Sequence, residues 1–139
     1  MATSIAPMLE VRDGAAAIAF YRTAFGAREL WRLGDGAVAG LSIEGAEFFL
    51  AEDSPVHGHR APDSAGFTTV RIELFVDDPR AVRDRALAAG AVEHSPVLEH
   101  HHDTRGVRPI RRILQGAVVD PFGHMWLIGK VLEWGPTQA

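Results

Sequence analysis

The sequence lacks cysteine entirely, which excludes disulfide bonds, thiol nucleophiles and thiolate metal ligands together. Lysine is nearly absent as well: Lys130 is the single lysine among 14 basic residues, and these are scattered and outnumbered by 18 acidic residues. A nucleic-acid-binding surface is therefore not expected. No apolar run approaches the roughly 18 residues of a membrane span. Residues 1–9 lack the basic start and apolar core of a signal peptide, so the sequence predicts a cytoplasmic protein.

The chain contains one sequence pattern twice. LEVRDGAAAIAFYRTAFGA begins at Leu9, and LFVDDPRAVRDRALAAGA begins at Leu74. Each copy has a short apolar strand ending at an aspartate, then a helical stretch closed by a glycine: Asp13 and Gly26, then Asp78 and Gly90. Aspartate side chains accept hydrogen bonds at helix starts, and glycine adopts the left-handed conformation that ends many helices.

Short strands and turns follow each predicted helix. In the first copy the strands are Arg28–Leu33, Val38–Glu44 and Glu47–Glu52, and in the second they are Val92–Val97, Arg111–Val119 and His124–Leu132. The unit is therefore β-α-β-β-β, an α+β arrangement within one domain. Residues 1–53 form the first module, 54–66 a linker rich in Pro, Ser, Asp and His, and 67–134 the second module. Leu98–Pro109 shows no strand pattern and is predicted to be a loop.

The repeated unit, together with VVDPFGHMWLIG near its end, resembles the vicinal oxygen chelate superfamily. That group includes glyoxalase I, extradiol dioxygenases, epimerases and the bleomycin-resistance class of drug-binding proteins. The resemblance covers essentially the whole chain. It implies the glyoxalase/bleomycin-resistance fold: two cupped mixed sheets around a cavity, helices on the outside, and frequently a homodimer.

Members of that superfamily hold a metal ion with four side chains, and the four positions can be carried over to this chain. They fall on Ala6, Leu50, Arg71 and Leu127, none of which is His, Glu, Asp or Gln. The guanidinium of arginine is permanently charged and has no lone pair for a metal. The resemblance therefore implies a branch without the usual metal ligands, and we expect no metal and no cofactor.

Strand alternation predicts which residues line the cavity. In VRIELFVD, the apolar face expected to pack beneath the helices consists of Ile72, Leu74 and Val76. The same parity assigns Ala6, Glu10 and Glu52 to the cavity, and the ligand-binding set it predicts is Met8, Phe48, Leu50, Arg71, Glu73, Phe75, Met125 and Leu127. Apolar and aromatic side chains with a few charges are typical of a site for an organic ligand.

Arg71 has two interpretations. It can pair with Glu73, Glu10 or Glu52 and so neutralise partly buried charges. Alternatively, it can grip a carboxylate, phosphate or phenolate of a ligand through two hydrogen bonds.

Histidines also have two interpretations. The run EHHHD, Glu99 to Asp103, contains metal-binding side chains, and His100 and His102 share a side if the segment is extended. A solvated loop is favoured, because adjacent loop residues rarely close around one ion and a metal site needs further ligands. His124 in DPFGHMW is expected to make a structural hydrogen bond rather than to transfer a proton.

Three functions remain open. The leading hypothesis is a metal-independent protein that binds a small organic molecule in a dimer cavity and sequesters an antibiotic or metabolite. The alternative is a lyase, isomerase or dioxygenase of the same superfamily that uses a relocated metal, held by Glu10, Glu52, Glu73 or the histidine run, or a glutamate such as Glu73 as general base. The third is an interaction module whose cup is filled by its own side chains. Whether the protein catalyses a reaction is left open.

Overall fold

The computed structural model describes residues 1–102 and 110–135 and contains the β-α-β-β-β unit twice. The first unit consists of β1 (Met8–Val11), α1 (Gly14–Phe25), β2 (Arg28–Leu33), β3 (Val38–Ile43) and β4 (Ala46–Glu52). The second consists of β5 (Arg71–Phe75), α3 (Pro79–Ala89), β6 (Val92–His101), β7 (Ile110–Val119) and β8 (Met125–Trp134). Three short helical turns were not predicted: η1 (Gly34–Gly36), η2 (Pro55–His57) and α2 (Pro62–Ala65).

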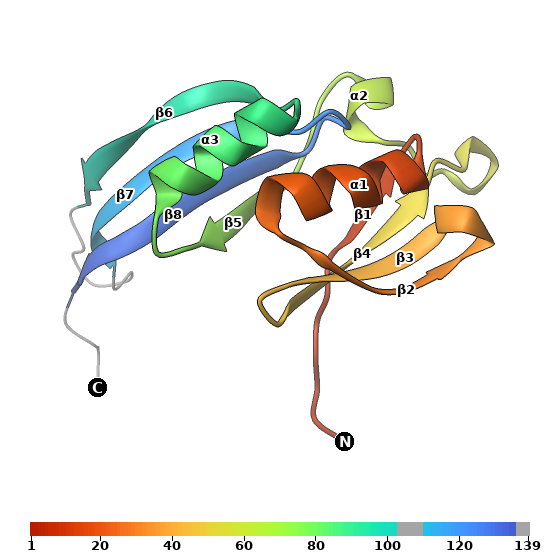
Figure 1. Ribbon diagram of the computed structural model, residues 1–139, viewed down its shortest axis with the longest axis horizontal. Helices are drawn as coiled ribbons and strands as arrows, with labels where there is room; N and C mark the ends of the chain where they lie inside the picture. Colours follow the sequence, from red (N-terminus) through yellow and green to blue (C-terminus); the bar gives the residue numbers. More distant parts are fainter. Residues whose placement is uncertain (103–109, 136–139) are drawn as a thin grey trace.

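Each unit forms a four-stranded mixed sheet. The strand orders are β1-β4-β3-β2 and β5-β8-β7-β6, so the two sheets have equivalent topologies. The pairs β1–β4 and β5–β8 are parallel, and the other pairs are antiparallel. Figure 1 shows the sheets side by side, with α1 and α3 next to each other on the same side of them. The predicted α+β fold is confirmed.

Both long helices begin and end where the sequence predicts. Asp13 accepts a hydrogen bond from the backbone of Ala16 at 2.9 Å, and Asp78 accepts one from Ala81 at 3.1 Å. Gly26 ends α1 in the left-handed conformation, with a φ of 66°. Within the described ranges, no helix combines the length and apolar character needed to cross a membrane.

The predicted loop Leu98–Pro109 is wrong in its first part, because β6 continues to His101. Backbone pairing with β7 extends along this polar segment, from Leu98 opposite Gln115 to His101 opposite Arg112. β6 is an edge strand of its sheet. It is largely exposed, so it can remain a strand without apolar alternation. Residues 103–109 lie outside the described part of the chain.

One hydrophobic core joins the two units beneath the helices. Phe25 of α1 packs against Trp126 of β8, with ring centroids 4.7 Å apart. Tyr21 contacts Phe48 at 5.4 Å and Trp126 at 5.5 Å. Because the aromatic side chains come from both units, neither unit can keep this core intact alone.

The carboxylate of Asp120, in the DPFGH turn, is 4% exposed and sits at the centre of a hydrogen-bond network between the units. One oxygen accepts hydrogen bonds from the hydroxyl of Tyr21 and from the indole of Trp126, the latter at 2.9 Å. The other accepts the backbone N–H groups of Phe122 at 2.9 Å and His124 at 3.0 Å. Burial, followed by the charge of Asp120, raises the pKa of Tyr21 well above its ordinary value, so Tyr21 remains a hydrogen-bond donor.

His124 makes a second connection between the units. Its Nε2 lies 2.7 Å from the carbonyl oxygen of Glu10 in β1, and because a carbonyl can only accept, the ring must donate. This is the structural hydrogen bond predicted for His124. Arg12, just after β1, donates to the carbonyl of Pro121 at 2.9 Å and lies over the ring of Phe122. The DPFGH turn is thus bonded to both the first strand and the first helix.

Replacing Asp120 with alanine leaves four buried donors without an acceptor. We therefore expect Asp120→Ala to lower the free energy of unfolding by about 3–5 kcal/mol, and Tyr21→Phe, which removes one donor, by about 1–2 kcal/mol. Urea denaturation followed by circular dichroism measures both losses. As a control, Asp84→Ala removes an exposed carboxylate on α3 and should change stability by less than about 0.5 kcal/mol. Equal effects at positions 84 and 120 would contradict this account.

Candidate functional site

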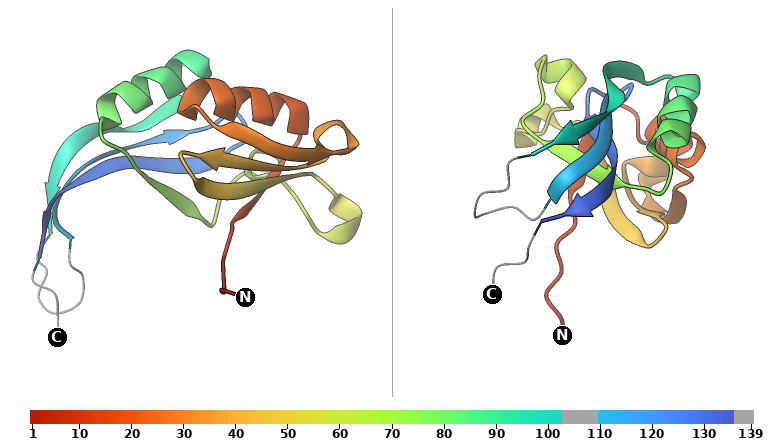
Figure 2. Two further views of the ribbon diagram at one scale, coloured as in Figure 1. Left: turned by 60° about the horizontal axis from the view of Figure 1, so that its bottom comes forward. Right: turned by 90° about the vertical axis from the view of Figure 1, so that its left-hand side faces the viewer.

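Each sheet has one face covered by a helix and one face open to solvent. Figure 2 shows the helices on one side of the curved sheets and the opposite faces uncovered. In β1, Leu9 and Val11 are buried in the shared core, whereas Met8 is half exposed. Since neighbouring side chains in a strand alternate, Met8 and Glu10 lie on the uncovered side. We call the uncovered sides of the two sheets the first open face (β1–β4) and the second open face (β5–β8).

The prediction that Phe48 and Leu50 line the cavity is wrong. Both side chains are buried against the helices, and Phe48 touches Tyr21 and Trp126. The register explains the reversal, because Leu50 lies opposite Leu9 and Phe49 opposite Met8. The open-face residues of β4 are Glu47, Phe49 and Ala51. Glu52 alternates with them and so belongs to the opposite face of the strand.

A tryptophan and a phenylalanine form an aromatic wall on the first open face. Trp31 of β2 lies 5.6 Å from Phe49, measured between ring centroids, and is 40% exposed. Between them in the sheet is Gly40, where an added Cβ would lie 2.5 Å from the indole nitrogen of Trp31. Glycine at this position therefore lets the indole lie flat across the strand. Strand alternation alone does not identify Phe49 as the partner of Trp31, but the missing side chain at Gly40 is a signal that could have indicated the contact.

The second open face carries the other predicted residues. Ile72 and Leu74 of β5 pack against the core, as predicted, while Phe75 on the opposite parity is 51% exposed. Arg71 and Glu73 share the exposed parity. The register places Met125 opposite Arg71 and Leu127 opposite Glu73, so these predicted residues lie together on this face. Met8 lies on the first open face, in the other sheet.

Arg71 is not paired with the acids suggested as its partners. Among residues 1–102 and 110–135, no ion pair joins Arg71 to Glu73, Glu10 or Glu52. Glu10 is instead 3.7 Å from His59. The guanidinium of Arg71 is therefore not held by any of these three carboxylates.

Glu73 has a different partner, Gln115 of β7, which sequence reasoning missed. The amide of Gln115 donates to the Glu73 carboxylate at 3.3 Å. Gly129 of β8 lies between the two strands, opposite both Phe75 and Gln115. Because Gly129 has no side chain, Gln115 can reach across β8 to Glu73. Recognising this pair requires the register between β7 and β8, which the sequence alone does not give.

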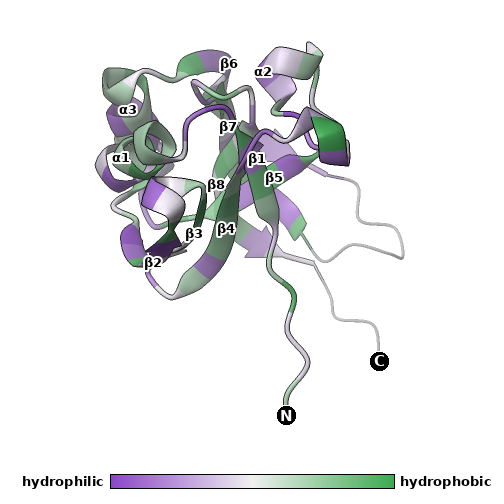
Figure 3. Ribbon diagram, turned by 90° about the vertical axis from the view of Figure 1, so that its right-hand side faces the viewer, coloured by the Kyte–Doolittle hydropathy of each residue, from purple (hydrophilic) through white to green (hydrophobic). Residues whose placement is uncertain are grey.

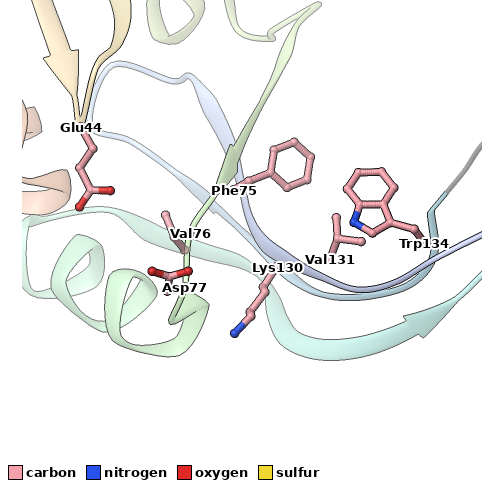
Figure 4. Close-up of a pocket in the computed structure, with 7 residues that line it drawn as sticks. All are labelled: Glu44, Phe75, Val76, Asp77, Lys130, Val131 and Trp134. Carbon is pink, nitrogen blue, oxygen red and sulfur yellow. The ribbon is translucent and has the colours of Figure 1, made fainter.

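A hollow of about 520 Å³ lies at the end of β5, beside β8. Its lining includes Phe75, Val131 and Trp134, with Lys130 and Asp77 at its margin. Figure 4 shows the rings of Phe75 and Trp134 and the side chain of Val131 on one side of β8, whereas Lys130 points to the other. The ring of Trp134 is 61% exposed. An open aromatic surface of this kind can stack against a planar or apolar organic group.

The histidine run forms no metal-binding cluster within the described ranges. His100 Nε2 lies 3.1 Å from the carbonyl oxygen of Gln115, and His101 is 3.1 Å from Glu99. Glu99 also accepts a hydrogen bond from Arg112, which lowers the pKa of that carboxyl. No group of three or more His, Asp or Glu side chains in residues 1–102 and 110–135 is arranged to hold a metal ion. Asp103 lies outside the described residues.

Comparison with known proteins agrees with this architecture. Residues 7–128 match the model of the glyoxalase-like domain, and the chain therefore belongs to that family, within the vicinal oxygen chelate superfamily. It is 38% identical over 134 residues to an uncharacterised protein from Mycobacterium bovis, covering 91% of this chain and 82% of that protein.

Solved structures share the fold. A gene product from Arabidopsis thaliana is 26% identical, with a TM-score of 0.66 and coverage of 91% of this chain and 98% of that one. A glyoxalase/bleomycin resistance protein/dioxygenase family enzyme from Burkholderia phytofirmans PsJN is 21% identical, with a TM-score of 0.67 and coverage of 90% and 95%.

The packing of Trp31 over Gly40 can be tested without a ligand. In Gly40→Ala the new methyl group occupies the space of the indole, so Trp31 should move into water and the tryptophan emission should shift to longer wavelength. Fluorescence of the folded protein measures the shift. The same substitution made in a Trp31→Phe background should leave the emission unchanged. A shift of equal size in both backgrounds would show that Trp31 does not lie over Gly40.

Proposed function

We propose that the protein binds a small organic molecule on its open faces without the metal ion that the superfamily usually employs. The observation that carries the proposal is the chemistry of the positions carried over from the superfamily's metal site. Arg71 and Leu127 lie diagonally across the β5–β8 pair on the second open face and offer no metal ligand, and Leu50 is buried in the core. A fixed positive charge beside hydrocarbon opposes a divalent cation and favours an organic group or an anion.

The proposed site needs a second copy of the chain to complete it. Each open face exposes large apolar side chains: Met8 and Trp31 on the first, Phe75 and Trp134 on the second. A cup that buries most of a small ligand requires a wall on both sides, and one curved sheet supplies only one. We propose a homodimer in which the open faces are covered by the partner. Figure 3 shows the first sheet with β1 and β4 uncovered on the side away from α1.

Binding of an anionic or aromatic ligand follows from this surface. Within the part of the chain that the structure describes, Arg71 makes no ion pair with Glu73, Glu10 or Glu52. Its guanidinium can therefore hold a carboxylate, phosphate or phenolate by two hydrogen bonds. The rings of Phe75 and Trp134 can stack against an aromatic portion. Sequestration of an antibiotic or metabolite is consistent with such a surface, and the fold neighbour from Burkholderia carries bleomycin resistance in its family description.

An enzymatic function is the alternative, and one observation favours it. Oε2 of Glu10 is buried with no hydrogen-bond partner in the described structure, and burial raises the pKa of this carboxyl group. A carboxyl group with a raised pKa can serve as a general acid or base. A relocated metal on Glu10, Glu52 or Glu73 would give the same class of enzyme. Metal analysis of untagged protein separates an enzyme with a relocated metal from the metal-independent binding protein, since the binding protein should contain well below one metal ion per chain.

Arg71 provides the sharpest test of ligand binding. In a thermal-shift screen of aromatic carboxylates and phosphates, we expect at least one compound to raise the melting temperature saturably. Arg71→Ala should weaken its binding by about tenfold or more, measured by calorimetry, because a charge-assisted hydrogen bond is lost. Arg22→Ala, on the exposed side of α1, is the matched control and should leave the affinity unchanged. Equal affinities for wild type and Arg71→Ala would reject the role of Arg71.

The homodimer gives an independent test. Light scattering of the purified protein should yield twice the mass of one chain. Phe75→Asp places a charge on the second open face and should shift the equilibrium toward monomer, because desolvating an unpaired carboxylate is unfavourable. Val56→Asp changes an apolar residue that is exposed in the linker and should leave the mass unchanged. A monomeric wild type at high concentration would contradict the dimer.

A further inference from the structure

A separate pocket of about 430 Å³ lies where β1 meets the linker that leads to β5. Its lining includes the apolar side chains of Met8, Phe67 and Val70, and Phe67 is 67% exposed. Glu10 and Arg60 supply the charged groups of the lining. The pocket is built from the first strand, the α2 turn and residues 67–70. It lies outside the hollow beside Trp134.

Glu10 is the unusual member of this lining, because one of its oxygens is isolated. Oε2 is buried and has no hydrogen-bond partner, while the side chain as a whole keeps 20% of its surface exposed. Oε1 lies 3.7 Å from Nδ1 of His59, which is too long for a hydrogen bond. A carboxylate shares its charge between both oxygens. A cation arriving at the accessible side of Glu10 would therefore compensate the oxygen that lacks a donor.

We infer that this pocket binds an organic ammonium ion, with the ammonium group on Glu10 and an apolar or aromatic body against Phe67 and Val70. The burial of an unpartnered carboxylate oxygen selects a donor that carries positive charge. The exposed ring of Phe67 adds surface for the ligand body and attraction for the cation. Met8 and Glu10 belong to the first open face as well, but the proposal uses neither Arg71 nor the hollow beside Trp134.

The other charged groups near Glu10 are compatible with a cation. Arg60 is exposed, so water screens its charge. His124 uses its Nε2 to donate to the backbone oxygen of Glu10. A divalent metal ion is a poorer fit, because no group of three ligating side chains surrounds Glu10 in the described ranges.

Acidification should weaken the proposed binding. Burial raises the pKa of Glu10, with His59 and His124 acting to lower it and Asp53 to raise it. As the pH falls through this raised pKa, the carboxylate gains a proton and no longer attracts the ammonium ion. The other charged or titratable groups that face Glu10 are His59, His124, Asp53 and Arg60.

The test uses three compounds of nearly the same shape on the full chain: benzylamine, benzyl alcohol and benzoate. Calorimetry should give saturable binding of benzylamine, at least about tenfold tighter than of benzyl alcohol, because only the amine satisfies the carboxylate charge. Glu10→Gln should remove that preference. The difference between wild type and Glu10→Gln should also shrink as the pH falls through the raised pKa of Glu10 and the carboxylate gains a proton.

Two further variants keep the result interpretable. Phe67→Ala removes an exposed ring from the lining and should weaken benzylamine binding without affecting folding. Glu93→Gln, on β6 of the other sheet, is the matched control and should bind benzylamine like wild type. Equal binding of amine and alcohol, stronger binding of benzoate, or an amine preference that survives in Glu10→Gln would each overturn the proposal. If the protein bound a ligand through Arg71 but did not bind benzylamine, this inference would be overturned while the function proposed for Arg71 would stand.

Discussion

The carboxylate of Asp120 is the constraint on which the arrangement of the two units depends. Removing an ionised carboxylate from water is costly unless its oxygens receive hydrogen bonds, and Asp120 receives four. Two donors are backbone groups of its own turn, one is the indole of Trp126, and one is the hydroxyl of Tyr21 in the first unit. The carboxylate of Asp120 therefore fixes the conformation of its own turn and also bonds that turn to α1. His124 adds a bond from the same turn to β1.

This connection determines which surfaces remain available for function. With the turn bonded to α1 and β1, both helices lie on one side, and the aromatic residues of α1 pack with Trp126 of β8 in one core. The opposite faces of both sheets are left without a covering layer. Polar and aromatic side chains collect there, including Glu73 with Gln115 and Trp31 over Gly40. The same turn leaves the pocket at Glu10 between β1 and the linker. The surfaces available for ligand binding are therefore those that the core does not bury.

Local signals in the sequence predicted the elements that depend on local chemistry. Asp13 and Gly26 marked both ends of α1, because helix caps act through neighbouring backbone groups. The orientation of β5 was also predictable, since only one of its faces is apolar. β4 was not, because EFFL is apolar on both faces and alternation cannot choose between Phe48 and Phe49. The length of β6 was missed because an exposed edge strand needs no apolar pattern. The Glu73–Gln115 bond and the hydrogen bonds of Asp120 depend on contacts between distant segments.

The claim that the two units form one cooperative structure through Asp120 can be measured most directly by native-state hydrogen exchange. The slowest-exchanging amides of α1 and of β8 should open with the same free energy, within about 1 kcal/mol, because loss of the shared network exposes both. Unequal values would contradict the account. If the amides of α1 exchanged through an opening several kcal/mol less costly than that of β8, the two units would be held together separately and not by one shared network.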